Sequence, residues 1–364
     1  MYVYQNEGAP EVTVRGTLND LYDAEAKENK RIFFNDATSI KSLGLFNLAA
    51  NRANTKGKTV TIELGNEEFK DIAYSENRTG YKGKGLLIGN RSLNWYASSP
   101  VTNEKDKLTL VIEGGSVTSS STGYESIDGL SGTSVYMLLP NGNTDVTFKN
   151  VIFNNVISFD IQKYSSPWSN LDSLTLDSCT FNGIIVGTVP SEKVKIDGCT
   201  FNEYINTTYA NNSNPIWWRA DLEGRDGNFV TIEQFEFTNN RVSSTRPIKI
   251  ERVGRRDNSK KYTPVFKFLD NTFDISSQSS DTVTKNMAIN IGQNDGDSYY
   301  HLYDDGNTIS SNTASLYTAA LGSGSNQWLA VPGTKIMDRN GNEKTIIARV
   351  WKSATETFEM KSVN

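Results

Sequence analysis

A repeated pattern of apolar residues is the feature of this sequence that most restricts its fold. Each copy spans eight residues, with apolar residues at the first, third and eighth positions and one small, apolar or amide residue, the column residue, at the sixth. The pattern fits without an internal gap at segments that start with Leu110, Val146, Leu174, Val194, Val230, Phe266 and Leu302. Successive starts are 36, 28, 20, 36, 36 and 36 residues apart. Such periods indicate a solenoid of stacked coils.

Each copy predicts two short strands joined by a sharp corner. Alternation of apolar and polar residues is typical of a strand, and the residues in the middle of the copy are turn formers. These corner pairs are Lys149-Asn150, Asp177-Ser178, Asp197-Gly198 and Asp305-Gly306. A coil of about twenty residues accounts for the shortest step, so the longer steps must add loops on one side. The predicted fold is all-β, a parallel β-helix.

Stacked coils place equivalent residues in columns with a spacing of about 4.8 Å. An aromatic column is predicted from Phe153, Phe181, Phe201, Phe237 and Phe273, ending at Ile309. The neighbouring column contains Val151, Cys179, Cys199, Phe235, Asn271 and Asn307. The two cysteines are therefore expected to be buried thiols. The chain lacks the leucine and asparagine spacing of leucine-rich repeats and the four-strand period of propeller blades.

The segments VTFKNVIFNN, LTLDSCTFNG and VKIDGCTFNE begin at Val146, Leu174 and Val194. They resemble coils of the pectin-lyase-like superfamily of single-stranded right-handed parallel β-helices, in which Asn or Gly occupies the corner between two short strands. The resemblance covers roughly residues 85–310 and implies this right-handed fold. The superfamily includes polysaccharide lyases, glycoside hydrolases, bacterial surface adhesins and phage tailspikes, so the resemblance does not select an activity.

Three regions are expected along the chain. Residues 1–84 form an N-terminal cap with the first coil, residues 85–310 the β-helix, and residues 311–364 a C-terminal β cap or small β module. In the first region, helices are predicted at residues 17–22 and 42–53 and strands at residues 31–34 and 60–64. In the last region, strands are predicted at residues 328–331, 345–351 and 357–360. Caps of this kind cover the open ends of the apolar columns.

Composition excludes several classes of function. The net charge of −5 disfavours tight binding to nucleic acid, and no apolar run is long enough to span a membrane. Two cysteines and one histidine, His301, are too few for a disulfide framework or a Cys/His zinc site, and no cofactor is expected. Metal binding through carboxylates stays open. Residues 1–16 do not resemble a secretory signal, so either a signal was removed or the native product starts in the cytosol.

A strand precedes each copy, and the outward residues of these strands form the candidate site. Alternation in residues 216–223 places Ile216 and Trp218 in the core and their neighbours outside. The same reasoning in other coils gives an outer strip of Asp160, Trp217, Arg219, Asp221, Lys249, Glu251 and Asn290. An aromatic face beside fork-shaped donors and carboxylates suits a glycan, whose ring stacks and whose hydroxyls need partners. An ordinary solvated strand face shows the same alternation, so both interpretations stay open.

Two enzyme classes of the superfamily have different residue requirements. The resemblance implies that a lyase would use a Lys or Arg base, with carboxylates or Ca²⁺ neutralising an acidic substrate. The residues of these types in the outer strip are Arg219, Lys249, Asp221 and Glu251. Polygalacturonase-like hydrolases carry NTD, DD, GHG and RIK motifs in that order. This chain has no GHG, and Arg246-Pro-Ile-Lys249 precedes Asp304-Asp305, which excludes that class.

The leading hypothesis is a non-catalytic β-helix that binds a glycan or a host cell-surface polysaccharide, as an adhesin-like or phage fibre-like module. The alternative is a polysaccharide lyase acting on an acidic glycan, and the third option is a structural spacer. An extracellular or cell-surface location is expected, or else a virion. Neither nucleic acid binding nor membrane insertion is expected. Homo-oligomerisation is an option, as a trimer if the chain is fibre-like.

Overall fold

The structure, a computed structural model, describes separate stretches of the chain, and all their regular structure is β-strand. These stretches are residues 2–14, 30–34, 45–46, 57, 59–70, 73–75, 82–89, 108–118, 133–138, 144–154, 158–161, 171–183, 185–187, 191–203, 214–219, 221–223, 229–253, 263–276, 287–293, 300–313, 315–321, 335–352 and 357–363. They include no helix that could cross a membrane. The chain divides into two compact units, Met1–Asn182 and Gly183–Asn364, and each is described by itself.

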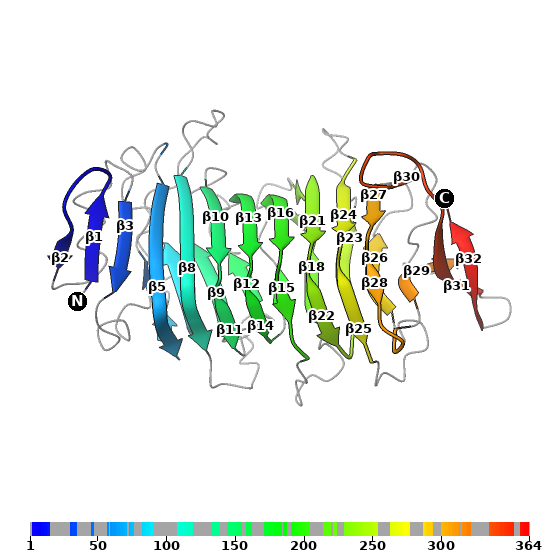
Figure 1. Cartoon of the computed structure of the whole chain (residues 1–364), viewed down its shortest axis with the longest axis horizontal. Coiled ribbons are helices and arrows are strands. Elements are labelled where there is room, and N and C mark those ends of the chain that lie inside the picture. Colours follow the sequence, from blue (N-terminus) through cyan, green and yellow to red (C-terminus); the bar gives the residue numbers. More distant parts are fainter. Residues whose placement is uncertain are drawn as a thin grey trace. The chain divides into compact units, whose positions relative to one another are not determined.

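In the first unit, one parallel sheet carries the repeated copies (Figure 1). This repeat sheet contains β5 (Thr59–Lys70), β8 (Leu108–Thr118), β10 (Thr144–Lys149), β11 (Ile152–Asn154), β13 (Leu171–Asp177) and β14 (Thr180–Asn182). Val146 pairs with Leu110 on one side and Leu174 on the other. Phe153 likewise pairs with Val117 and Phe181. The register predicted from the repeat is therefore confirmed in this unit.

A second parallel sheet of the first unit contains the strands between the copies. This companion sheet pairs β4 (Leu45–Phe46), β7 (Lys82–Gly89), β9 (Thr133–Leu138) and β12 (Ser158–Ile161), with β6 (Ala73–Ser75) antiparallel to β7. Along the chain, strands of the two sheets alternate from β7 to β14. Parallel strands that alternate in this way are consistent with the coils of a β-helix.

The start of the chain adds antiparallel strands to the repeat sheet. β1 (Tyr2–Asn6) pairs antiparallel with β2 (Val12–Val14) and with β3 (Lys30–Phe34), which runs parallel to β5. The helix predicted at residues 17–22 lies outside the described residues. Within the helix predicted at residues 42–53, Leu45–Phe46 is a strand, because its backbone pairs with Leu87 and Ile88 of β7. Local helical periodicity is overridden there by sheet pairing.

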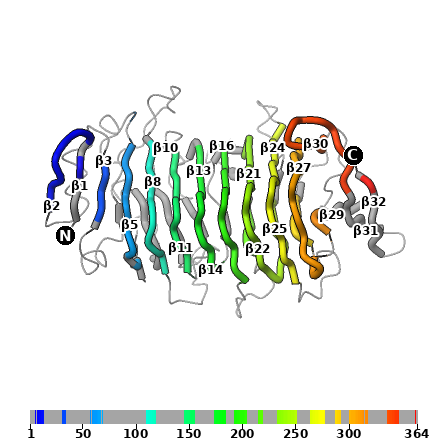
Figure 2. The backbone as a smooth tube through the Cα atoms, in the orientation of Figure 1, coloured from blue at the N-terminus to red at the C-terminus, as the bar shows by residue number. Residues whose placement is uncertain are grey.

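The second unit repeats the arrangement of two sheets (Figure 2). Its repeat sheet contains β16 (Ser191–Asp197), β17 (Thr200–Phe201), β21 (Gln234–Thr238), β22 (Arg241–Ser244), β24 (Val265–Leu269), β25 (Thr272–Ile275), β27 (His301–Asp305), β28 (Thr308–Ile309) and β30 (Lys335–Met337). Its companion sheet contains β15 (Ile185–Gly187), β18 (Ile216–Arg219), β23 (Ile248–Val253), β26 (Met287–Gln293), β29 (Ser315–Leu321) and β31 (Ile346–Lys352). Within each sheet, the strands that pair with one another are parallel.

Two antiparallel elements complete the second unit. β31 pairs with β32 (Thr357–Val363), which confirms strands at residues 345–351 and 357–360 with small shifts of their ends. The strand predicted at residues 328–331 lies outside the described residues. β19 (Asp221–Glu223) and β20 (Phe229–Thr231) form a separate two-stranded hairpin.

The corner of each coil depends on one residue with a left-handed backbone. Asn150, Ser178, Gly198 and Gly306 have φ values of 54°, 54°, 64° and 67°, at the corners that the sequence predicted. Asn239 and Asp270 take the same conformation, with φ values of 56° and 57°. Glycine adopts this region without steric cost, and Asn and Asp tolerate it better than other side chains. The corner therefore explains the Asn, Asp and Gly residues at this position.

The coil predicted to start at Val230 has a different register, because Val194 pairs with Phe235. Both frames satisfy the apolar pattern, but the frame from Val230 would place Gln234 at the left-handed corner. The observed frame places Asn239 there. Val230 instead belongs to the hairpin strand β20, opposite Leu222. The prediction was wrong by five residues, since apolar spacing was weighed without the corner.

The buried columns form the core of each unit. In the first unit, the rings of Phe153 and Phe181 stack with centroids 5.0 Å apart. In the second, one buried column contains Phe201, Val242 and Phe273, and Phe237 lies in a different column with Ile196 and Phe268. Ile309 is in register with Phe273 but is 43 % exposed, so the predicted aromatic column is buried only as far as Phe273. Cys179 and Cys199 are free thiols and each is 1 % exposed, which confirms their predicted burial.

Amide side chains form a buried ladder at the corners of the second unit. The corrected column contains Cys199, Asn240, Asn271 and Asn307. The Oδ1 of Asn271 accepts from the backbone N–H of Asn240 at 2.9 Å, and its Nδ2 donates to the Phe237 carbonyl at 2.8 Å. Asn307 repeats this arrangement toward Asn271 and Phe268, at 3.0 and 2.6 Å. The ladder thus satisfies backbone groups that the corner takes out of the sheet.

Truncation of Phe201 tests the buried column. Phe201 is 1 % exposed and its ring lies 5.7 Å from that of Phe237. Phe201→Ala should lower the free energy of unfolding by about 3–5 kcal/mol, as is usual for a buried Phe. Ile152→Ala is the control, because Ile152 is 41 % exposed, and should change it by less than about 0.5 kcal/mol. Equal losses in chemical denaturation would contradict the inside and outside assignment.

Asn271→Ala tests the ladder. Asn271 is fully buried, and its loss leaves the Asn240 donors and the Phe237 carbonyl without their partner. The free energy of unfolding should fall by at least about 2 kcal/mol, because each buried group left unsatisfied costs about 1–3 kcal/mol. Asn312→Ala removes an exposed amide and should be nearly neutral. A neutral Asn271→Ala in denaturant titration would contradict a stabilising ladder.

Candidate functional site

The structure brings part of the predicted outer strip into register on three neighbouring strands. Trp217 of β18 pairs with Lys249 of β23, and Lys249 pairs with Asn290 of β26. Arg219 and Glu251 are opposite each other two residues further along β18 and β23. Because parallel strands lie about 4.8 Å apart, Trp217 and Lys249 are direct neighbours.

Trp217 and Lys249 lie on the face of the companion sheet that is turned away from the core. Ile216, Trp218, Ile248 and Ile250 are all 0 % exposed, whereas Trp217 and Lys249 are half-buried. The Lys249 Nζ lies 4.7 Å from the centre of the Trp217 ring. A cation at this distance is attracted by the negative face of the indole ring. This pair, the Trp217–Lys249 pair, is the part of the outer strip whose side-chain geometry is defined.

Asn290 does not extend this exposed surface. The residue is 4 % exposed, and so little of it reaches solvent that a ligand could not contact it on an open face. Every residue from Met287 to Ile291 is buried, so both faces of β26 are covered. In the described part of the chain, the Oδ1 of Asn290 has no hydrogen-bond partner. The prediction that Asn290 is exposed is therefore wrong. Alternation indicates on which face of a strand a residue lies, but not whether another part of the chain covers that face.

The structure describes only the backbone of the remaining outer-strip residues. Asp160 lies on β12 of the first unit, opposite Tyr136. Asp221 does not continue β18: it begins β19 and pairs antiparallel with Thr231. The structure does not describe the side chains of Asp160, Arg219, Asp221 and Glu251. Among the described residues, no group of three or more His, Cys, Asp or Glu side chains is arranged to hold a metal ion.

A comparable pair lies on the repeat sheet of the second unit. The outward residues Glu236, Lys267 and Tyr303 are in register on β21, β24 and β27. Lys267 Nζ lies 2.6 Å from Glu236 Oε1 and 5.9 Å from the centre of the Tyr303 ring. Glu236 therefore neutralises this lysine. The Tyr303–Lys267 pair is a second half-buried combination of an aromatic ring and a cation, on a different sheet.

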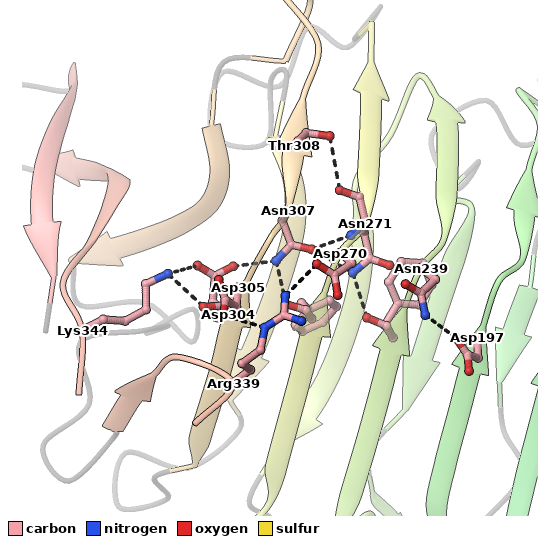
Figure 3. Close-up of polar contacts among 12 residues, drawn as sticks. Asp197, Asn239, Asp270, Asn271, Asp304, Asp305, Asn307, Thr308, Arg339 and Lys344 are labelled. Carbon is pink, nitrogen blue, oxygen red and sulfur yellow. Dashed lines mark hydrogen bonds and ion pairs between the residues drawn. The ribbon is translucent and has the colours of Figure 1, made fainter. Parts of the chain in front are cut away.

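A polar cluster at the end of the repeat sheet was not predicted from the sequence (Figure 3). Arg339 follows β30, and its side chain bridges two corners of the sheet. Its Nη2 donates to Asp270 Oδ1 at 2.7 Å and its Nε to Asp305 Oδ2 at 2.8 Å. Gly306 leaves room for this bridge, because a Cβ there would collide with the Asp270 carboxylate. The partners are 69 and 34 residues from Arg339, so no local motif reveals them.

Asp304 forms the buried half of this cluster. It pairs with Phe268 and so takes a core position of the repeat, as the alignment predicted. Its Oδ1 accepts from Tyr317 Oη at 3.0 Å and from Asn307 Nδ2 at 2.7 Å. Its Oδ2 lies 3.0 Å from Lys344 Nζ. The carboxylate is thus compensated by a cation and two donors, which is the condition for keeping a buried charge.

The ionisation of the cluster follows from these contacts. Hydrogen bonds from Arg339 lower the pKa of the exposed Asp305 carboxyl, and the paired carboxylates raise the pKa of Arg339. Burial, followed by the nearby Asp304 carboxylate, raises the pKa of Tyr317 well above its ordinary value. All three groups therefore keep their ordinary charge states at neutral pH. The charged groups of the cluster are paired with one another, so the cluster fixes Arg339 and Lys344 to the end of the repeat sheet.

Comparisons with models of protein families, with curated proteins and with solved structures found no match.

Arg339→Ala tests the bridge through the titration of Asp305. The folded pKa of Asp305 lies below its ordinary value, so its contribution to stability is present above about pH 4 and is lost as pH falls through the folded pKa. The variant should raise this pKa toward the ordinary value, measured by carboxyl NMR titration. It should also be less stable than wild type near neutral pH and similar to it in strong acid.

Lys195→Ala provides the control for this experiment. It removes an ion pair with Asp197, at 3.1 Å, on a strand inside the repeat sheet. The titration of Asp305 should be the same in this variant as in wild type. An Asp305 titration that does not change in Arg339→Ala would contradict the bridge.

Proposed function

We propose that this chain is a non-catalytic β-helix that binds a glycan or a host cell-surface polysaccharide. The observation that carries the proposal is Trp217, a half-buried indole on a strand whose neighbours Ile216 and Trp218 are 0 % exposed. A rigid strand thus presents an aromatic face outside the core, with a lysine beside it. Sugar rings stack on such faces, and a lysine donates hydrogen bonds to their hydroxyl or acidic groups.

The second part of the proposal concerns the hand and the family type of the fold. We propose that the coils are right-handed and belong to the pectin-lyase-like type. The support is the match of repeat, corner and amide ladder, together with the preference of parallel crossovers for the right hand. The antiparallel strands β1–β2 and β31–β32 are proposed as caps at the two ends of the chain, as a solenoid requires. A helical N-terminal cap remains a prediction for residues 17–22.

The proposed setting follows from the proposed ligand. A binder of surface polysaccharide works outside the cell, at a cell surface or on a virion, and a trimer would multiply weak glycan contacts in a fibre. The negative net charge of the chain supports a partner other than nucleic acid. We propose neither a cofactor nor insertion into a membrane.

A polysaccharide lyase remains the second candidate. Its specific support is the register of Arg219 with Glu251 beside the Trp217–Lys249 pair, which places two bases and a carboxylate on adjacent strands. In this function Arg219 or Lys249 would be the base, while Asp221 and Glu251, with Ca²⁺, would neutralise the substrate acid. An eliminating enzyme forms an unsaturated product, which is detected by its ultraviolet absorbance.

Trp217→Ala tests the binding function. The variant should lose retention on a glycan array or on cells at which wild type is retained, because stacking is lost, while its melting temperature changes little. Tyr303→Ala is the matched control, since it removes the aromatic member of the Tyr303–Lys267 pair on the other sheet. It should bind as wild type does. Lys249→Ala should weaken retention of acidic glycans only.

Three outcomes separate the functions. Loss of retention in Trp217→Ala but not in Tyr303→Ala supports the binder. Release of an unsaturated product by wild type supports the lyase instead. Equal retention of all variants on every surface would contradict the site and leave the structural spacer.

A further inference from the structure

The segment 335–345, called the C-terminal strap, ends the repeat sheet of the second unit. β30 adds three residues to β27 in the parallel register of another coil. The chain then reverses, so that Met337 bridges Glu343 antiparallel and Lys344 donates its N–H to the Ile336 carbonyl at 2.9 Å. The edge of β30 that does not face β27 thus pairs with the second half of the strap.

Three basic residues of the strap form ion pairs that hold it in place. Arg339 and Lys344 anchor it to the carboxylates of Asp270, Asp305 and Asp304. Its first residue, Lys335, lies opposite His301 and forms an ion pair of 2.9 Å with Glu343. Carboxylate anchors thus hold the strap at Arg339 and Lys344, and its first residue places an ammonium opposite an imidazole.

His301 is the single histidine in the chain. It is half-buried on β27, between Val265 of β24 and Lys335 of β30. The next outward residues along β27 are Tyr303 and Asp305, and Asp305 is engaged by Arg339. On β24 the next outward residue is Lys267, which is paired with Glu236. Among the described residues, Lys335 is thus the charged group directly opposite His301, with Glu343 as its counter-ion.

We infer that His301 makes the C-terminal strap sensitive to pH, because its protonation places two cations on adjacent strands and favours opening of the strap. Burial, and then the Lys335 charge, lower the pKa of His301 in the closed strap. Opening returns the imidazole toward its ordinary value near 6.5. The closed form therefore loses stability as pH falls below about 6.5, and the loss is complete below the folded pKa.

The carboxyls of Asp305 and Asp338 do not respond in this range. Hydrogen bonds from Arg339 lower the pKa of Asp305, and those from Asn342 lower the pKa of Asp338 in the turn of the strap. Both carboxylates therefore keep their charge between pH values of about 5 and 7. A response of the strap in this range is therefore not due to these two carboxyls, and the His301 variant tests whether it is due to the imidazole.

Hydrogen exchange of the full chain tests the inference. Protection factors for peptides within residues 335–345, corrected for intrinsic exchange, should fall more than about twofold in wild type between about pH 7.5 and about pH 5. In His301→Gln they should stay constant, and in Lys335→Gln the fall should be smaller. Peptides from residues 263–276, which cover β24 and β25, are the internal control and should not change.

NMR provides a second measurement that does not depend on the His301 variant. The single imidazole gives signals that need no further assignment, and its midpoint should move toward the ordinary value in Lys335→Gln. A constant strap in wild type, or an equal fall in a folded His301→Gln, would overturn the inference. So would an imidazole titration that is the same in wild type and Lys335→Gln.

Discussion

The left-handed residue at each corner is the constraint on which the rest of this structure depends. It lets two short strands meet at a sharp bend, so that one coil can pack on the next with every side chain in register. The bend removes backbone groups from sheet pairing, and in the second unit the amides of Asn240, Asn271 and Asn307 satisfy them. Corner conformation, buried amide and apolar column are therefore three parts of one solution.

The column formed by the third residue of each copy shows how the repeat sheet of the second unit ends. Where earlier coils bury Ile196, Phe237 and Phe268, the last one has Asp304. A carboxylate in an apolar column is tolerated because Tyr317, Asn307 and Lys344 compensate it. Because a buried carboxylate without such partners is costly, Asp304 favours the arrangement in which the strap places Lys344 beside it. The end of the sheet is thus defined by charge and hydrogen bonding, whereas its interior is defined by apolar packing.

The candidate binding residues lie on the face of the companion sheet that is turned away from the core. The core residues of β18 and β23 fix the positions of Trp217 and Lys249 without sharing their environment. That separation lets a solenoid carry a binding surface on strands whose stability comes from the opposite face. The proposed glycan contact relies on this property and on the rigidity of neighbouring coils. The Tyr303–Lys267 pair shows that an aromatic and cation pair also occurs elsewhere, so the choice between the two surfaces is made by experiment.

Alternation within a few residues was enough to predict the strand and corner repeat, the burial of both cysteines, and the outward orientation of Trp217 and Lys249. It placed the coil at Val230 wrongly, since the apolar spacing fits two frames and the left-handed corner at Asn239 selects the other. Only the tertiary structure decided that Asn290 is covered, that Asp221 leaves β18, and that Arg339 joins Asp270 and Asp305. These features depend on contacts between residues far apart in the chain, which no local periodicity encodes.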